Sequence, residues 1–195
     1  MKTPMTALAG IRRITLMLMI VPLLAACGLN RATTPFSVVA PEIDPPRMLQ
    51  GETVDWALAI RRPVTDQTRD SEQILVRTDG FRLLPYAGAV WLDATPDWLR
   101  AMMIEALESP GVFAAVDRTG RGERFLVLET ELLRFEAVED EAGLLGVDVE
   151  LRARLINPRG GDLVAARTFS ARQSAAGNDL DTLIPAFESA LGDVI

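Results

Sequence analysis

A short apolar run that ends just before the only cysteine of the chain constrains the fold more than any other feature. Three basic residues precede the run, which covers residues 14–24. At about 1.5 Å per residue it spans roughly half of a 30 Å hydrocarbon core, so it indicates a secretory signal rather than a transmembrane helix. The sequence Leu24-Ala25-Ala26-Cys27 matches the bacterial lipobox, in which the thiol is acylated and the signal is cut before it. The alternative is an ordinary signal followed by an incidental cysteine.

Cleavage before Cys27 determines what the mature chain can contain. Residues 1–26 are then the lipoprotein signal peptide, residues 27–35 a lipidated tether, and residues 36–195 a single domain. The chain has no His, one Cys, and no Lys after Lys2. A histidine-based triad, a disulfide, a His or Cys zinc site and a Schiff-base lysine are therefore excluded within one mature chain. We expect no catalytic residues, no metal and no cofactor.

The charge of the mature chain argues against one class of partner. The signal contains three of the 20 basic residues and none of the 27 acidic residues, so the mature net charge is −10. Nucleic-acid binding needs basic surface to neutralise phosphates, so we expect no nucleic-acid partner. We expect instead a membrane partner, reached through acyl chains on Cys27. Self-association of the chain is left open.

Alternating polarity and turn signals predict an α/β fold. We expect strands at residues 36–40, 54–62, 73–77, 81–86, 112–117, 125–136, 144–156 and 163–172. One helix begins at Thr95-Pro96-Asp97, with Thr95 as N-cap, and a second carries an apolar stripe after a cap at Asp181 or Thr182. The predicted architecture is a single domain with a mixed, mostly antiparallel sheet and helices packed on it.

Two stretches are candidate functional sites. Glu129 and Glu131 lie two residues apart in a strand, which makes a carboxylate pair conceivable. The alternative is a cross-strand charge ladder with Arg152 and Arg154 of the next strand. Between Tyr86 and Trp91 only small residues and one valine occur, so these two aromatics are candidates for a partner or cargo contact. The alternative is that Trp91 fills the core.

Four stretches together resemble a known family. Residues 73–93, 106–118, 125–136 and 167–169, behind a lipobox, resemble the ABC-type transport auxiliary lipoprotein family. That family includes the paraquat-inducible lipoproteins that accompany MCE-domain (mammalian cell entry) lipid transporters. Family members often carry Arg directly before the tryptophan of the first stretch, whereas Val90 precedes Trp91 here, so no role of that arginine is carried over.

The resemblance implies a function that composition alone does not. It implies an α/β, lipid-anchored periplasmic accessory subunit, without catalysis of its own, of an ABC/MCE-type system that moves lipids or other hydrophobic molecules. Its partners would be MCE-domain and ABC transporter subunits. Gly28 and Leu29 carry no aspartate of the kind that retains many lipoproteins in the inner membrane, so we expect the periplasmic face of the outer membrane. The alternative function is a structural or assembly lipoprotein with no transporter role.

Overall fold

The structure is a computed structural model, and it describes residues 36–42, 53–108, 111–120 and 124–195. The predicted signal peptide, the lipidation site Cys27 and the predicted tether lie outside the described residues. Residues from Phe36 to Ile195 form one compact unit, which contains the sheet and both helices described below. Neither of these helices has the length and apolar character needed to cross a membrane.

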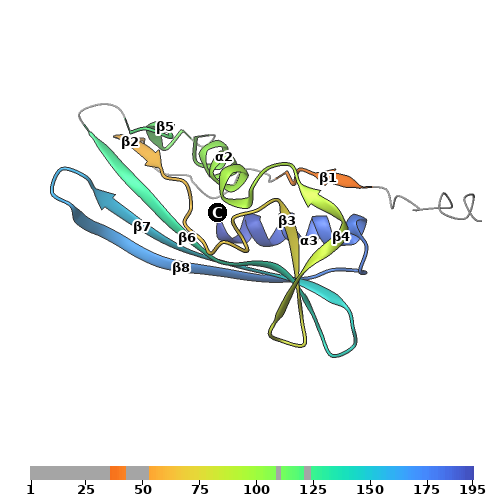
Figure 1. The fold of residues 1–195 in the computed structure, drawn as a ribbon. Helices are drawn as coiled ribbons and strands as arrows, with labels where there is room; N and C mark the ends of the chain where they lie inside the picture. The colour runs from red at the N-terminus through yellow and green to blue at the C-terminus, as the bar shows by residue number, and fades with distance from the viewer. Residues whose placement is uncertain (1–35, 43–52, 109–110, 121–123) are drawn as a thin grey trace, which may run out of the picture. The chain divides into compact units, whose positions relative to one another are not determined.

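A mixed sheet forms the framework of the described residues, and its longest strand is β6 (Figure 1). Six strands follow the order β1-β4-β3-β6-β2-β5, and β7 pairs with β6 and β8. The strands are β1 (Ser37–Val39), β2 (Val54–Ile60), β3 (Gln73–Thr78), β4 (Arg82–Trp91), β5 (Phe113–Asp117), β6 (Phe125–Glu139), β7 (Leu145–Asn157) and β8 (Asp162–Ser174). Each predicted strand is therefore present, with ends shifted by a few residues.

The prediction of a mostly antiparallel sheet is wrong. Among the described strands, β1 with β4, β2 with β5, β2 with β6, and β3 with β6 are parallel pairs. Only β3 with β4, β6 with β7, and β7 with β8 are antiparallel. The antiparallel pairs are those joined by short turns, which leave a local sequence signal. The parallel pairs join strands distant in sequence, and alternation within a strand does not identify its neighbour.

The described residues form two helices, α2 (Thr95–Glu108) and α3 (Leu180–Val194). The residues predicted as caps lie inside the two helices, at or just after the first residue of each. The Thr95 hydroxyl donates to the Ser71 carbonyl oxygen (3.1 Å), so it fastens the helix start to the preceding loop. The cap of α3 is Asp179, whose carboxylate accepts from the Thr182 backbone N–H (3.0 Å). With the cap at Asp179, Pro185 falls beyond the first turn, and the helix continues through it.

Both helices cover the same face of the sheet. The Phe135 ring on β6 contacts Trp98 of α2 and Phe187 of α3, with ring centroids 5.4 and 4.8 Å apart. Trp91, at the end of β4, contacts the same three rings. These aromatic side chains join the two helices and two strands in one core.

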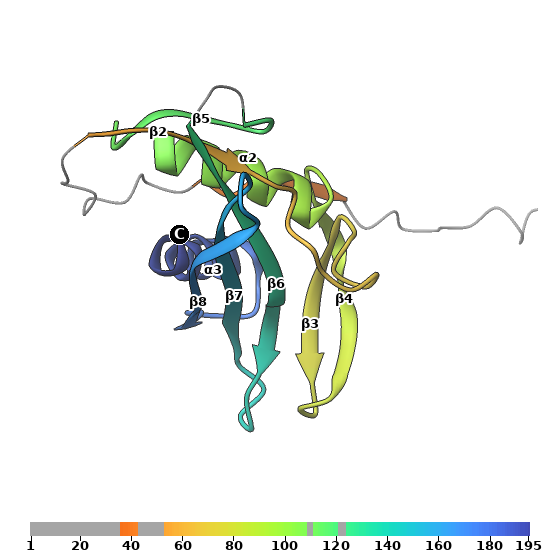
Figure 2. The ribbon, with the colours of Figure 1, turned by 90° about the vertical axis from the view of Figure 1, so that its left-hand side faces the viewer.

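The other face of β6, β7 and β8 is charged. Residues directly opposite each other in an antiparallel pair share a face. The register pairs Glu136 with Asp148, Arg134 with Glu150, and Glu131 with Arg152. Neither α2 nor α3 packs over these side chains, and Figure 2 shows α3 on the other side of β7 and β8. The segment between β2 and β3 runs beside β6 at the edge of this face, and charged side chains gather there.

Candidate functional site on the open face of the sheet

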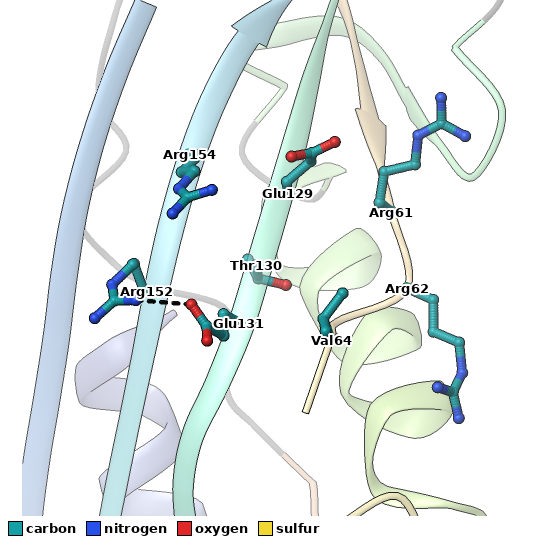
Figure 3. Close-up of a pocket in the computed structure, with 8 residues that line it drawn as sticks. All are labelled: Arg61, Arg62, Val64, Glu129, Thr130, Glu131, Arg152 and Arg154. Carbon is teal, nitrogen blue, oxygen red and sulfur yellow. Dashed lines mark hydrogen bonds and ion pairs between the residues drawn. The ribbon is translucent and has the colours of Figure 1, made fainter. Parts of the chain in front are cut away.

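A cavity of about 550 Å³ lies where the segment after β2 meets β6 and β7. It is lined by Arg61, Arg62, Val64, Glu129, Thr130, Glu131, Arg152 and Arg154 (Figure 3). Its volume is in the range that binds small ligands. We call this cavity the arginine groove.

Backbone hydrogen bonds hold one wall of the arginine groove in place. The Arg61 N–H donates to the Leu128 carbonyl (3.0 Å), and the Val64 N–H donates to the Thr130 carbonyl (2.9 Å). The segment therefore continues along β6 beyond the end of β2, filling the interval between β2 and β3. The polar sequence of residues 64–71 does not indicate this wall, because an irregular segment has no periodic pattern.

The register of β6 and β7 settles how the predicted carboxylate pair is arranged. Glu131 lies opposite Arg152, and Glu129 lies opposite Arg154, as the alternative of a cross-strand ladder predicts. Arg152 donates to the Glu131 carboxylate at 2.8 Å. This ion pair makes Glu131 an acceptor held by a cation, which is the geometry of a charge ladder.

Two cations of the groove have no acidic partner within the described residues. Arg61 and Arg154 form no ion pair there, and Glu129 lies between them in Figure 3. Guanidinium groups bind phosphate and carboxylate through paired hydrogen bonds. The groove therefore offers two arginines to an anionic group, and one carboxylate that could accept from a donor on the same ligand.

Arg62 points away from the groove and stabilises its wall. Its guanidinium donates to both carboxylate oxygens of Asp97 (3.0 and 2.9 Å) and to both of Asp70 (3.1 and 2.6 Å). These hydrogen bonds hold the pKa values of Asp97 and Asp70 below the usual range of a carboxyl group. Arg62 therefore ties the segment after β2 to the first turn of α2.

A buried ion cluster fixes the other end of the same segment. Glu136 on β6 is 0% exposed, and one of its oxygens accepts from Nε and Nη2 of Arg69 (3.0 and 2.7 Å). The other oxygen accepts from Nε and Nη2 of Arg77 on β3. Arg69 also bonds Asp66. Burial opposes ionisation of Asp66, yet its bonds to Arg69 outweigh this effect and lower the pKa of the carboxyl.

The predicted aromatic contact residues lie in different environments. Trp91 is 1% exposed and belongs to the core, as the alternative for this stretch expects, and a partner or cargo contact involving it stays a prediction. Its place at the buried end of β4, between both helices, is the physical reason for the burial. Tyr86 is half-buried, and its hydroxyl donates to the Asn178 carbonyl (3.0 Å) just before α3. A contact through Tyr86 stays a prediction.

Across the ranges that the structure describes, no group of three or more carboxylate or thiol side chains is placed to hold a metal ion. What the arginine groove provides is a set of charged groups, supplied by the segment after β2 and by two long strands.

Comparison with known proteins gives a family match and similar solved structures. The family model described as "ABC-type transport auxiliary lipoprotein component" matches residues 41–195. A crystal structure from Xanthomonas campestris, a protein assigned to the DUF330 family, is 29% identical, with a TM-score of 0.74 over 81% of this chain and 90% of that one. Another crystal structure, of an uncharacterised protein, is 12% identical, with a TM-score of 0.63 over 81% and 92%, and shows the fold alone. No curated protein matches the chain.

Proposed function

Since the chain belongs to the family of ABC-type transport auxiliary lipoprotein components, we propose that it is the lipid-anchored periplasmic subunit of an ABC system with an MCE-domain partner. The family match to residues 41–195 supports an accessory role in transport and carries the proposal. The cargo in this proposal is a lipid or another hydrophobic molecule. The lipobox at Leu24 to Cys27 supports the anchor.

The anchor proposed is an acyl group on Cys27, in the inner leaflet of the outer membrane. Labelled palmitate should enter the wild-type chain and be lost in Cys27→Ala. Membrane fractionation of wild type and Gly28→Asp tests the sorting, because Gly28 stands where an aspartate would retain many lipoproteins in the inner membrane. Wild type in the inner-membrane fraction would contradict the outward assignment. Equal distribution of wild type and Gly28→Asp between the two membranes would show that residue 28 does not determine the sorting.

The proposed role is binding rather than turnover. The Glu131 carboxylate is held by Arg152, and a general acid or base must be free to exchange a proton with a substrate. We therefore expect no hydrolysis of envelope glycans or esters by the purified chain. Turnover that disappears in both Glu129→Gln and Glu131→Gln, but not in Glu150→Gln on the same sheet face, would contradict this part of the proposal.

Association is the decisive test. The full-length, affinity-tagged chain should be crosslinked in cells and purified, and the captured proteins identified by mass spectrometry. We expect an ATPase, a permease and an MCE-domain subunit, with less of each in Cys27→Ala because that variant loses its membrane position. Capture of outer-membrane assembly proteins in their place would favour the alternative of a structural or assembly lipoprotein. Genes for the three expected subunits beside this gene would be independent support.

A further inference from the structure

The turns of two hairpins meet at one end of the sheet and carry exposed apolar side chains. The β3–β4 turn holds Phe81, which is 74% exposed, and the β6–β7 turn holds Leu144, which is 52% exposed. Both hairpins project together at the bottom of Figure 2 and of Figure 1. We call residues 79–82 together with residues 139–144 the paired tips.

The sheet topology places the two tips side by side. Strands β3 and β6 are parallel, and their last paired residues are Arg77 and Val138, directly before the two turns. A cavity of about 450 Å³ between the turns is lined by Asp79, Gly80, Glu139, Asp140, Glu141 and Gly143. Segments about sixty residues apart in sequence therefore form one surface.

The backbone of each tip follows a defined turn. Asp79 and Gly80 have φ values of 50° and 75°, as the two central residues of a tight hairpin turn require. In the other tip, the Asp140 carboxylate accepts from the Ala142 and Leu144 backbone N–H groups (2.8 and 2.9 Å). A turn whose backbone is already fixed loses little backbone entropy on binding, so it suits the presentation of anchor side chains.

The tips are strongly acidic around their apolar side chains. Four carboxylates surround them, from Asp79, Glu139, Asp140 and Glu141. The cation of Arg82 lies among them. It pairs with Asp79 (2.7 Å), and its guanidinium lies 5.6 Å from the centroid of the Phe81 ring. The surface therefore combines two apolar anchors with a net negative rim.

This charge distribution selects among the possible occupants. A second copy that docked tip to tip would bring carboxylates against carboxylates, which is repulsive. An anionic lipid surface would be repelled for the same reason. A protein surface with Lys or Arg around an apolar pocket matches both the anchors and the rim.

We propose that the paired tips are a docking surface for a basic, apolar-pocketed face of a periplasmic protein, and that this protein is the MCE-domain subunit. The identity of the partner rests on the proposed function. The chemistry of the surface rests on Phe81, Leu144 and the four carboxylates. The arginine groove plays no part in this contact.

The test measures binding of the full chain in detergent to the purified periplasmic domain of the MCE-domain subunit. Phe81→Ser with Leu144→Ser should weaken binding at least about tenfold, as loss of buried anchors does. The matched control is Leu163→Ser at the start of β8, because Leu163 is 59% exposed and lies at the opposite end of β7 and β8. It should bind as wild type does. All the replaced side chains are exposed, and thermal unfolding should show that each variant is folded.

A second variant tests the rim independently of the anchors. Glu139→Gln with Glu141→Gln should weaken binding and reduce its dependence on salt, whereas Glu105→Gln with Glu108→Gln on α2 should change neither. The parallel probe is a vesicle of phosphatidylethanolamine and phosphatidylglycerol, to which the tips should not bind.

The outcomes separate the two proposals. Wild-type binding to the subunit that survives both tip variants would overturn the docking surface and leave the proposed function standing. Failure of wild type to bind any subunit of the transporter would overturn both. Tip-dependent binding to the vesicle, or tip-dependent dimerisation of the chain, would overturn the assignment of a protein partner of basic charge.

Discussion

Replacing the buried carboxylate of Glu136 by an amide should destabilise the domain severely. Glu136→Gln keeps the size of the side chain and removes its charge. In the wild type, Glu136 accepts five hydrogen bonds, two from Arg69, two from Arg77 and one from the Phe135 backbone N–H. A glutamine must turn its NH₂ group toward one of the two guanidinium groups, so that donors face donors. Both arginines then lose their shared counter-charge.

The magnitude follows from the burial. Glu136 is fully buried and Arg69 nearly so. Removing one partner of a buried ion pair costs about 3–5 kcal/mol, because it leaves an uncompensated charge. In a domain of this size, each kcal/mol lowers the melting temperature by roughly 2–4 °C, so a fall of roughly 6–20 °C is expected. Urea unfolding of the detergent-solubilised chain, followed by tryptophan fluorescence, measures the free energy directly.

A control and a rescue make this prediction refutable. Glu150→Gln alters a partly exposed carboxylate on the same sheet face, paired with Arg134 at 3.4 Å, and should change the free energy of unfolding by no more than about 0.5 kcal/mol. Replacing Glu136, Arg69 and Arg77 together by Leu, Met and Met should recover most of the stability. If Glu136→Gln costs no more than Glu150→Gln, the cluster does not hold the sheet together.

Three further predictions concern other contacts. Trp91→Ala should lower the free energy of unfolding by about 3–5 kcal/mol, and Trp56→Ala on the exposed part of β2 should cost much less, as urea unfolding would show. Tyr86→Phe removes one hydrogen bond and should cost about 0.5–1.5 kcal/mol, so a larger loss would indicate another role. Because Arg62 lowers the folded pKa of Asp97, the stability lost in Arg62→Gln should be greatest near neutral pH and should diminish as the pH falls below about 4. If the free energies of unfolding of wild type and Arg62→Gln differ by the same amount at every pH, the role given to Arg62 is contradicted.

Features with a local cause were predictable from the sequence. Asp79-Gly80 predicts a tight turn because few other residues adopt positive φ, and the hairpin forms there. The alternation of β7 predicts one apolar face, and Val147, Val149 and Leu151 are buried. The same alternation places Glu129 and Glu131 on one face of β6 and the arginines of β7 on one face of that strand, and the register of the hairpin then brings them opposite each other.

Features that depend on distant segments were not predictable in this way. A bulge between Leu132 and Arg134 shifts the phase of β6. Strict alternation would place Glu136 on the face opposite Glu131, whereas the shift places both on the open face. The two arginines that neutralise Glu136 come from β3 and from the segment before it. No pattern near Glu136 indicates them.

The arginine groove and the paired tips carry opposite charges, and this difference affects how the subunit could bind more than one molecule. The arginine groove presents cations at the middle of the sheet, and the paired tips present carboxylates beyond the last paired residues of β3 and β6. A single partner patch of one charge cannot complement both, because attraction at one surface becomes repulsion at the other. A basic protein held at the tips would therefore leave Arg61 and Arg154 free for an anionic group. An accessory subunit built in this way can hold a protein and contact a charged ligand at the same time, since the two sites do not share a residue.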